Sequence, residues 1–348
     1  MVKKMNENEI NSINLKYSKN YIFSFFYKVK QFLKAIIIKL SYLKKFDLIE
    51  EEHIKHFGKM YPDKTFYIIR RQPLGAGLLS NYHWVMNHLI YAIDKGYIPI
   101  VNMENYKTYF NENIPLETSN GKTLNAWEYY FEQPCGYSIN DIIKAKNVIL
   151  SNLTNYSIVK PLELYEIDTI IIQKYNELIT KYLNFNQITI KHFIDVKNKL
   201  FNNKSNILGV LYRGTDMKTA QLHYTPASLE ETINKTMQVF KEENFDYIFI
   251  RSEEQEAVDS FYKVFNNEKL IISDIHRITN YQRGTIAKIN FKSLFSVYKE
   301  GLDYLTEIYL LSQCDGIIAS KVNGTNFALG LNNNKYRYTY MFDNGINK

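Results

Sequence analysis

The chain has 348 residues, of which 45% are hydrophobic and 23% charged, and this composition excludes a largely disordered protein. Fourteen glycines and seven prolines exclude collagen-like and low-complexity classes, and two cysteines without a CxxC pair exclude a disulfide framework and argue against a structural zinc or iron–sulfur site. The net charge of +7 arises in the first 46 residues, which hold ten lysines and two glutamates, whereas the rest holds 33 basic and 34 acidic side chains. A nearly neutral body argues against binding to nucleic acid.

The basic N-terminal segment, residues 1–65, is predicted to be a helical extension. Four lysines interrupt its apolar stretch and no small-residue cleavage site follows, so neither a transmembrane helix nor a signal peptide is indicated. Apolar side chains recur every three or four residues between 25 and 43, which predicts an amphipathic helix with a lysine-rich polar face. We expect residues 20–45 to bind an anionic membrane surface. The alternative is a helix that packs on the protein itself or on a partner.

Alternation of strands and helices dominates the remaining chain. The first block predicts strands at 66–70, 97–101 and 147–150, helices at 78–95, 161–184 and 187–203, and an irregular stretch at 104–145. The second block predicts strands at 207–212, 247–250, 269–272, 316–319 and 336–341, and helices at 228–241, 254–264, 295–313 and 325–331. This alternation predicts an α/β protein with two Rossmann-like domains, residues 66–205 and 206–348, that face a cleft.

A glycine-containing turn follows the first predicted strand and opens the first helix. Gly75, Gly77 and Ser80 almost match the dinucleotide fingerprint, but Ser80 stands at the position of the third glycine. Such a turn offers main-chain N–H groups to an anion or a polar substrate. The alternatives are a dinucleotide site, a different cleft-lining role, and a tight connection without further function.

A second motif lies where a buried strand ends. Arg213, Gly214, Thr215 and Asp216 directly follow the strand at 207–212, and ligands of open α/β sheets bind outside the carboxyl ends of strands. An arginine there can grip a diphosphate through two parallel hydrogen bonds. Gly214 permits close approach of the main chain, Thr215 adds a hydroxyl donor, and Asp216 is spaced to hold the arginine or shape the loop. The alternative is a structural ion pair between Arg213 and Asp216.

The strand and its Arg-Gly-Thr-Asp sequence resemble the donor-site motif of fucosyltransferases of the GT-B type, which include core α-1,6-, rhizobial nodulation and protein O-fucosyltransferases. The resemblance implies that Arg213 grips the β-phosphate of GDP-fucose and that Asp216 is the acidic end of the motif. Two positions depart from the usual form of the first two groups: Leu211 stands where histidine is usual, and Gly214 where a second arginine is usual.

Further stretches match the same family in the same order. The strand that ends in Ser252 and two glutamates resembles a second donor-site segment, and 301–327 resembles the closing one. The resemblance implies that Glu307 reads the guanine base and that a polar loop binds the phosphates, namely Ser320, Asn323, Thr325 and Asn326. Glu307 as a solvated helix charge and the loop residues as helix caps are the structural alternatives. The first glycine turn resembles the loop on the acceptor side, which here includes Gly75, Gly77, Ser80 and His83.

The catalytic base is less clear from the residues. The α-1,6-fucosyltransferases place a glutamate a few residues after the arginine motif, where this chain has Gln221, which cannot act as a base. His223 lies two residues on, and an imidazole titrates near neutral pH, so His223 is the candidate base. A route without a strong protein base is the alternative. No Asp-x-Asp metal cluster, Gly-x-Ser-x-Gly elbow or phosphate-binding P-loop is present.

The sequence therefore predicts an inverting glycosyltransferase without metal or other cofactor. Its expected partners are a GDP-sugar, GDP-fucose or a related one, and a glycan or lipid-linked glycan acceptor. We expect a cytoplasmic enzyme on the inner face of the membrane that builds bacterial surface polysaccharide. The alternatives are an NAD-dependent oxidoreductase that uses the Gly75–Ser80 turn, and a catalytically silent nucleotide-sugar-binding adaptor at the membrane.

Overall fold

The computed structural model describes residues 49–72, 77–104, 115–118, 121–154, 168–218, 223–279 and 297–347, together with Leu33 and Phe46. The helix predicted over residues 20–45 lies outside these ranges except for Leu33. Residues Ile49–Lys348 form one compact unit. The predicted domain boundary between residues 205 and 206 stays a prediction, although each of the two large sheets lies on its own side of it.

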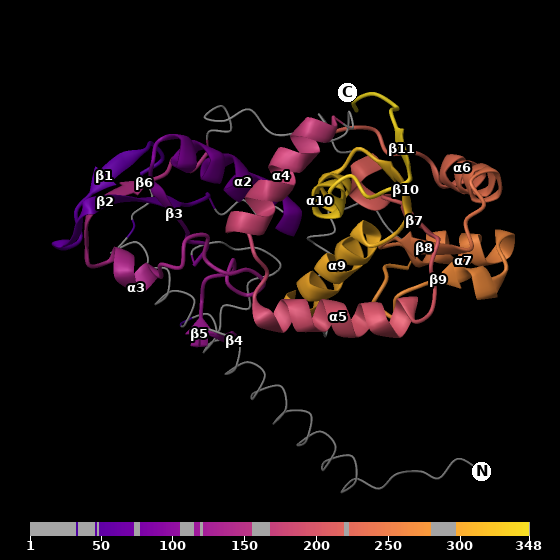
Figure 1. The fold of residues 1–348 in the computed structure, drawn as a ribbon, viewed down its shortest axis with the longest axis horizontal. Helices are drawn as coiled ribbons and strands as arrows, with labels where there is room; N and C mark the ends of the chain where they lie inside the picture. Colours follow the sequence, from indigo (N-terminus) through magenta and orange to yellow (C-terminus); the bar gives the residue numbers. More distant parts are fainter. Residues whose placement is uncertain are drawn as a thin grey trace, which may run out of the picture. The chain divides into compact units, whose positions relative to one another are not determined.

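The first sheet contains four strands in the order β1-β6-β2-β3 (Figure 1). Strand β2 pairs in parallel with β3 and with β6, whereas β1 pairs antiparallel with β6. The strands are β1 (His53–Lys55), β2 (Met60–Ile69), β3 (Ile98–Val101) and β6 (Ala145–Leu150). Helix α2 (Leu78–Asp94) connects β2 to β3, and a short hairpin and helix α3 lie between β3 and β6, namely β4 (Leu116–Thr118), β5 (Gly121–Thr123) and α3 (Ile139–Ile142).

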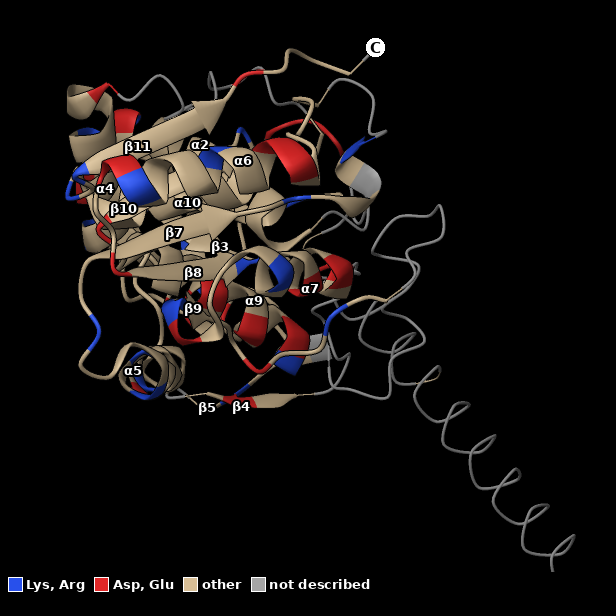
Figure 2. Ribbon diagram, turned by 90° about the vertical axis from the view of Figure 1, so that its right-hand side faces the viewer, with Lys and Arg blue, Asp and Glu red and all other residues tan. Residues whose placement is uncertain are grey.

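The second sheet contains five parallel strands in the order β11-β10-β7-β8-β9, which lie one below another in Figure 2. Two helices precede the sheet in the chain, α4 (Thr169–Tyr182) and α5 (Gln187–Phe201). The strands are β7 (Ile207–Leu211), β8 (Tyr247–Arg251), β9 (Leu270–Ile271), β10 (Gly316–Ser320) and β11 (Tyr338–Phe342). The connecting helices are α6 (Leu229–Glu242), α7 (Gln255–Val264), α9 (Val297–Ser312) and α10 (Asn323–Asn332).

The second sheet has helices on both faces, because side chains of a strand alternate between the two faces. Leu208 and Val210 of β7 pack in one core with Val239 of α6 and Phe261 of α7. Their neighbour Leu211 lies in the other core, which contains residues of α5, α9 and α10 and reaches residues of the first sheet. Figure 1 shows α6 and α7 on one side of the sheet and α9 and α10 on the other. All residues of β7 and β10 are buried, as a continuous apolar run predicts for a central parallel strand.

Local sequence signals account for several helix starts. Ser228 and Glu231 form a capping box at α6: the Ser228 hydroxyl accepts from the Glu231 N–H, and the Glu231 carboxylate accepts from the Ser228 N–H. Asn186 caps α5 by accepting from the Thr189 N–H at 2.9 Å. The α/β class and the parallel sheets are confirmed. The stretch predicted as irregular holds the β4–β5 hairpin and α3, which are too short to show a periodic pattern.

Candidate functional site

The order of the second sheet defines a switch point between β7 and β10. From β7 the chain adds β8 and β9 on one side, and it then returns to add β10 and β11 on the other side. The loops after β7 and β10 therefore leave their neighbouring strands in opposite directions, and open α/β sheets bind ligands in the crevice that this creates. Arg213 follows β7, and α10 begins directly after β10.

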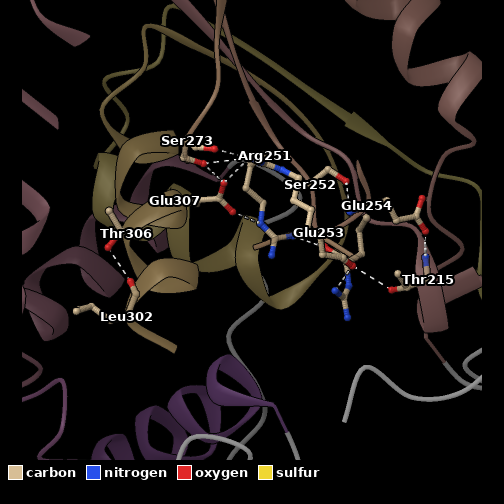
Figure 3. Close-up of polar contacts among 11 residues, drawn as sticks. Thr215, Arg251, Ser252, Glu253, Glu254, Ser273, Leu302, Thr306 and Glu307 are labelled. Carbon is tan, nitrogen blue, oxygen red and sulfur yellow. Dashed lines mark hydrogen bonds and ion pairs between the residues drawn. The ribbon is translucent and has the colours of Figure 1, made fainter. Parts of the chain in front are cut away.

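Arg213 is held at this edge by a buried carboxylate. Its Nη1 forms an ion pair with Glu253 Oε1, with 21% of the Arg213 side chain and 11% of the Glu253 side chain exposed. Glu253 also accepts from the Thr215 hydroxyl at 3.0 Å and from Arg251 Nη1 at 2.6 Å (Figure 3). Burial by itself raises the pKa of Glu253, but the Arg213 and Arg251 guanidiniums hold it below its usual value. Glu253 is therefore an ionised bridge between two arginines.

The neighbouring acid shapes the loop that carries Arg213. Glu254 Oε1 accepts from the Thr215 N–H at 2.6 Å, and Lys218 Nζ lies 3.8 Å from the same oxygen. A Cβ added to Gly214 would lie 2.3 Å from Glu254 Oε1, so only glycine leaves room for this carboxylate. Thr215 has a φ of 49°, which is uncommon outside glycine, and its bonds to both glutamates hold this conformation. Ser252 is buried and accepts from the Glu254 N–H at 3.0 Å, which orients the acid.

A second buried carboxylate lies behind the first. Glu307 on α9 is 1% exposed and accepts from the Ser273 hydroxyl. Its oxygens lie 3.4 Å from Arg251 Nε and 3.5 Å from Arg277 Nη2. Burial raises the pKa of Glu307 even though Arg251 lowers it. The predicted contact of Glu307 with guanine stays a prediction, and in this structure side chains of the protein itself surround the carboxylate.

The turn after β10 is built from buried polar groups. The Ser320 hydroxyl accepts from the Ala227 N–H at 3.0 Å, and the Ser320 carbonyl accepts from the Thr325 hydroxyl at 2.7 Å. Thr325 and Asn326 are buried, whereas Asn323 at the start of α10 is exposed. Ser320 and Thr325 therefore hold the turn, and Asn323 is the polar side chain of the predicted phosphate loop that lies open to a ligand.

The predicted acceptor-side residues lie at the start of α2, except that Gly75 lies outside the described residues. Gly77 precedes the helix, and the Ser80 hydroxyl accepts from Arg71 at 3.3 Å. His83 is half-buried, and its Nε2 lies 3.5 Å from the side-chain amide of Asn326. Burial lowers the pKa of His83 to about 4, with a hydrogen bond to the main chain of Asn323 acting in the opposite direction. His83 thus joins α2 to the first turn of α10 as a neutral imidazole.

The candidate base is less well placed by the structure. His223 is exposed, and its main-chain carbonyl accepts from the Asn347 N–H at 2.8 Å. Residues 219–222, which include Gln221, lie outside the described ranges, and so does the side chain of Asp216, whose main chain belongs to the turn Thr215–Lys218. The role of His223 therefore stays a prediction.

The structure adds residues that the sequence left without a role. Arg251 joins the two carboxylates into one network, to which Arg277 is added through Glu307, and Arg213 forms its ion pair with Glu253, which lies outside the motif. In the sequence, the run Arg251-Ser-Glu-Glu at the end of a buried strand indicates such ion pairs, because charged side chains next to a buried strand need partners of opposite charge. Within the described ranges, no three His, Cys, Asp or Glu side chains gather to hold a metal ion. In the same ranges, no helix is long and apolar enough to cross a membrane.

Comparison with known proteins gives distant likenesses. No family model and no curated protein matches the chain. Similar solved structures include the fucosyltransferase NodZ from Bradyrhizobium, at 12% identity and a TM-score of 0.42, over 76% of this chain and 92% of that chain. Arabidopsis thaliana FUT1 in complex with GDP has 11% identity and a TM-score of 0.43, over 84% and 71%. POFUT1 in complex with GDP has 8% identity and a TM-score of 0.46, over 80% and 99%.

These structures are fucosyltransferases, the class that the sequence motifs resemble. At such low identities and TM-scores, the likeness by itself establishes neither a common activity nor a common site.

Proposed function

We propose that the protein is a glycosyltransferase that uses a GDP-sugar, GDP-fucose or a related one. It transfers the sugar to a hydroxyl of a glycan or lipid-linked glycan, with inversion at the anomeric carbon and without a metal ion. The observation that carries the proposal is the position of Arg213 at the switch point, on a buried carboxylate and beside the start of α10. The ordered fucosyltransferase-like motifs in the sequence support the choice of a GDP-linked donor and of fucose or a related sugar.

The charges at the switch point favour an anion. Three arginines, Arg213, Arg251 and Arg277, share two carboxylates, Glu253 and Glu307, through the ion pairs described above. The network therefore carries a net charge of +1 when all five groups are ionised. Lys218 and Glu254 form a further pair that leaves this balance unchanged. A diphosphate that contacts Arg213 would compensate the excess charge, and a guanidinium binds phosphate oxygens through charge-assisted hydrogen bonds.

The same geometry suits the bond changes of sugar transfer. When the bond between the anomeric carbon and the diphosphate oxygen breaks, its electron pair stays on the β-phosphate, where Arg213 stabilises the developing charge. The acceptor oxygen forms the new bond on the opposite face of the sugar and loses its proton. His223 is the proposed base for that proton. Arg213 needs no large rearrangement, because Glu253 already holds its guanidinium at the strand edge.

Ligand-dependent stability tests the donor. We expect GDP to raise the midpoint of thermal unfolding, because a ligand that binds only the folded state stabilises it by mass action. UDP, CDP and NAD should have smaller effects. Arg213→Ala should weaken GDP binding by about tenfold or more, because it removes hydrogen bonds to a charged group. Arg337→Ala is the matched control, since Arg337 pairs with Glu243 rather than with the switch-point network. Stabilisation by NAD without any by GDP would refute the proposal.

A role in bacterial surface polysaccharide synthesis, at the inner face of the cytoplasmic membrane, extends the proposal. Its support is the sequence alone: the first 46 residues carry the excess positive charge and have the amphipathic pattern. The full chain should co-sediment with vesicles that contain anionic lipid, and removal of residues 1–46 should abolish this. Equal binding of the shortened chain would contradict the membrane assignment and leave the donor assignment untouched.

A further inference from the structure

Tyr304 lies at the same switch point and has no role in the site described so far. It comes from α9, and its ring centroid is 4.8 Å from the guanidinium carbon of Arg251. Its hydroxyl is 3.3 Å from the place where a Cβ on Gly324 would stand. Gly324 is the second residue of α10. Tyr304 therefore lies between the arginine network and the N-terminus of the helix that follows β10.

The Tyr304 hydroxyl is available as a donor. Within the part of the chain that the structure describes, no hydrogen bond of this hydroxyl is found, and the side chain is partly exposed. Burial raises the pKa of Tyr304, Glu253 and Glu307 add to this rise, and Arg251 and Arg213 act in the opposite direction. The phenol therefore keeps its proton at neutral pH and lies beside the Arg251 guanidinium. A protonated hydroxyl donates its strongest hydrogen bonds to acceptors that carry negative charge.

Gly324 lets the main chain of α10 come close to the Tyr304 hydroxyl. A Cβ at this position would lie 3.0 Å from Ile308 Cδ1 and 3.3 Å from the Tyr304 hydroxyl, so any side chain larger than that of glycine would push against the hydroxyl. The first N–H of α10 with a helical partner is that of Asn326, which donates to the Val322 carbonyl at 3.1 Å. The three N–H groups before it have no partner inside the helix, and they lie at its positive end.

We propose that Tyr304 is a further donor-binding residue, whose hydroxyl donates a hydrogen bond to a phosphoryl oxygen of the nucleoside diphosphate. Arg213 and Tyr304 then contact the diphosphate from two elements, the loop after β7 and helix α9, while the start of α10 supplies main-chain donors. The Tyr304 ring also packs on Arg251, which in turn holds Glu253 at 2.6 Å. The inference rests on the proposed function, and it names a contact that the sequence motifs do not assign.

Removal of one oxygen tests the contact. Tyr304→Phe keeps the ring on Arg251 and deletes only the hydroxyl, so the fold should be retained. We expect the Kd for GDP to rise about tenfold or more, as loss of a hydrogen bond to a charged acceptor predicts. Tyr309→Phe is the matched control, because Tyr309 lies on the same helix and stacks on Phe193 at 4.8 Å between ring centroids. Its Kd for GDP should equal that of the wild type. Inorganic pyrophosphate, used as a competitor, should lose affinity by a similar factor in Tyr304→Phe.

A second variant locates the contact beside α10. Gly324→Ala should weaken GDP binding in the wild-type chain, because the added methyl group lies against the Tyr304 hydroxyl. In the Tyr304→Phe background the same change should cost less, since coupled positions are not additive. If the wild type binds GDP and Tyr304→Phe binds it with the same Kd, the inference is overturned while the proposed function stands. Absence of GDP binding to the wild type would overturn the proposed function itself, so the two failures are distinguishable.

Discussion

Replacement of Glu253 by glutamine tests the central element of the site. The amide keeps the size of the side chain but removes the charge that Arg213 and Arg251 share. At an effective dielectric constant of about 20, two unit charges 2.6 Å apart, the separation of Arg251 from Glu253, attract by about 6 kcal/mol, and desolvation offsets part of this. Loss of one partner from a buried ion pair costs about 3 kcal/mol or more. We expect Glu253→Gln to lower the free energy of unfolding by about 3 kcal/mol.

The pH dependence of this loss identifies its cause. The pKa of Glu253 in the folded protein lies below its ordinary value of 4.5, so its contribution to stability is complete above that pH. The contribution disappears as the pH falls through the folded-state pKa, because the carboxylate must then be protonated. The difference between wild type and Glu253→Gln should therefore be full at pH 7 and shrink in acid below about pH 4.5.

Urea denaturation followed by circular dichroism measures both quantities. Glu268→Gln is the control, because Glu268 is exposed and lies in a short turn away from the network, so its effect should stay within about 0.5 kcal/mol. An effect of Glu253→Gln as small as that of the control at pH 7 would refute the reasoning. So would a difference that persists unchanged at low pH, since a defect of packing rather than of charge would then be responsible.

Two further changes probe the loop and the link between α2 and α10. Gly214→Ala places a methyl group 2.3 Å from Glu254 Oε1, so the carboxylate must leave the Thr215 N–H, and GDP affinity measured by calorimetry should fall by about tenfold. His83→Gln removes a histidine whose pKa is about 4 in the folded protein and near its ordinary 6.5 in the unfolded chain. Protonation of His83 should therefore lower the free energy of unfolding of the wild type by about 3 kcal/mol between pH 6.5 and 4. Urea titrations at stepped pH should show this decrease in the wild type and not in the variant.

Each of these changes has a matched control in the chain. Gly77→Ala meets no atom within 4 Å, so it should leave GDP affinity unchanged where Gly214→Ala does not. His223→Gln removes an exposed imidazole and should retain the acid-dependent loss of stability that His83→Gln lacks. Equal effects of the two glycine variants, or equal pH profiles of the two histidine variants, would contradict the respective explanations.

The sequence by itself determined the elements and the place of the arginine. Apolar runs such as Ile207–Leu211 predict buried parallel strands, and the helix predicted at 228–241 begins within one residue of the observed α6. Because these signals involve neighbours in the chain, they can be recognised without knowing the fold. The position of Arg213 at a strand end followed in the same way, from the strand and from the Gly-Thr that comes after it.

Only the tertiary structure decided which charges meet. The partner of Arg213 is Glu253, 40 positions along the chain, and the pair forms because β7 and β8 are neighbours in register, Leu211 opposite Arg251. Glu307 on α9 meets Arg277 across 30 positions, and it becomes buried although a helix pattern allows an exposed charge there. Strand order and register fix such contacts through packing of the whole core. The periodic spacing of apolar residues along the chain does not say which strands and helices become neighbours. The charged residues were therefore predictable from the sequence, while their partners were not.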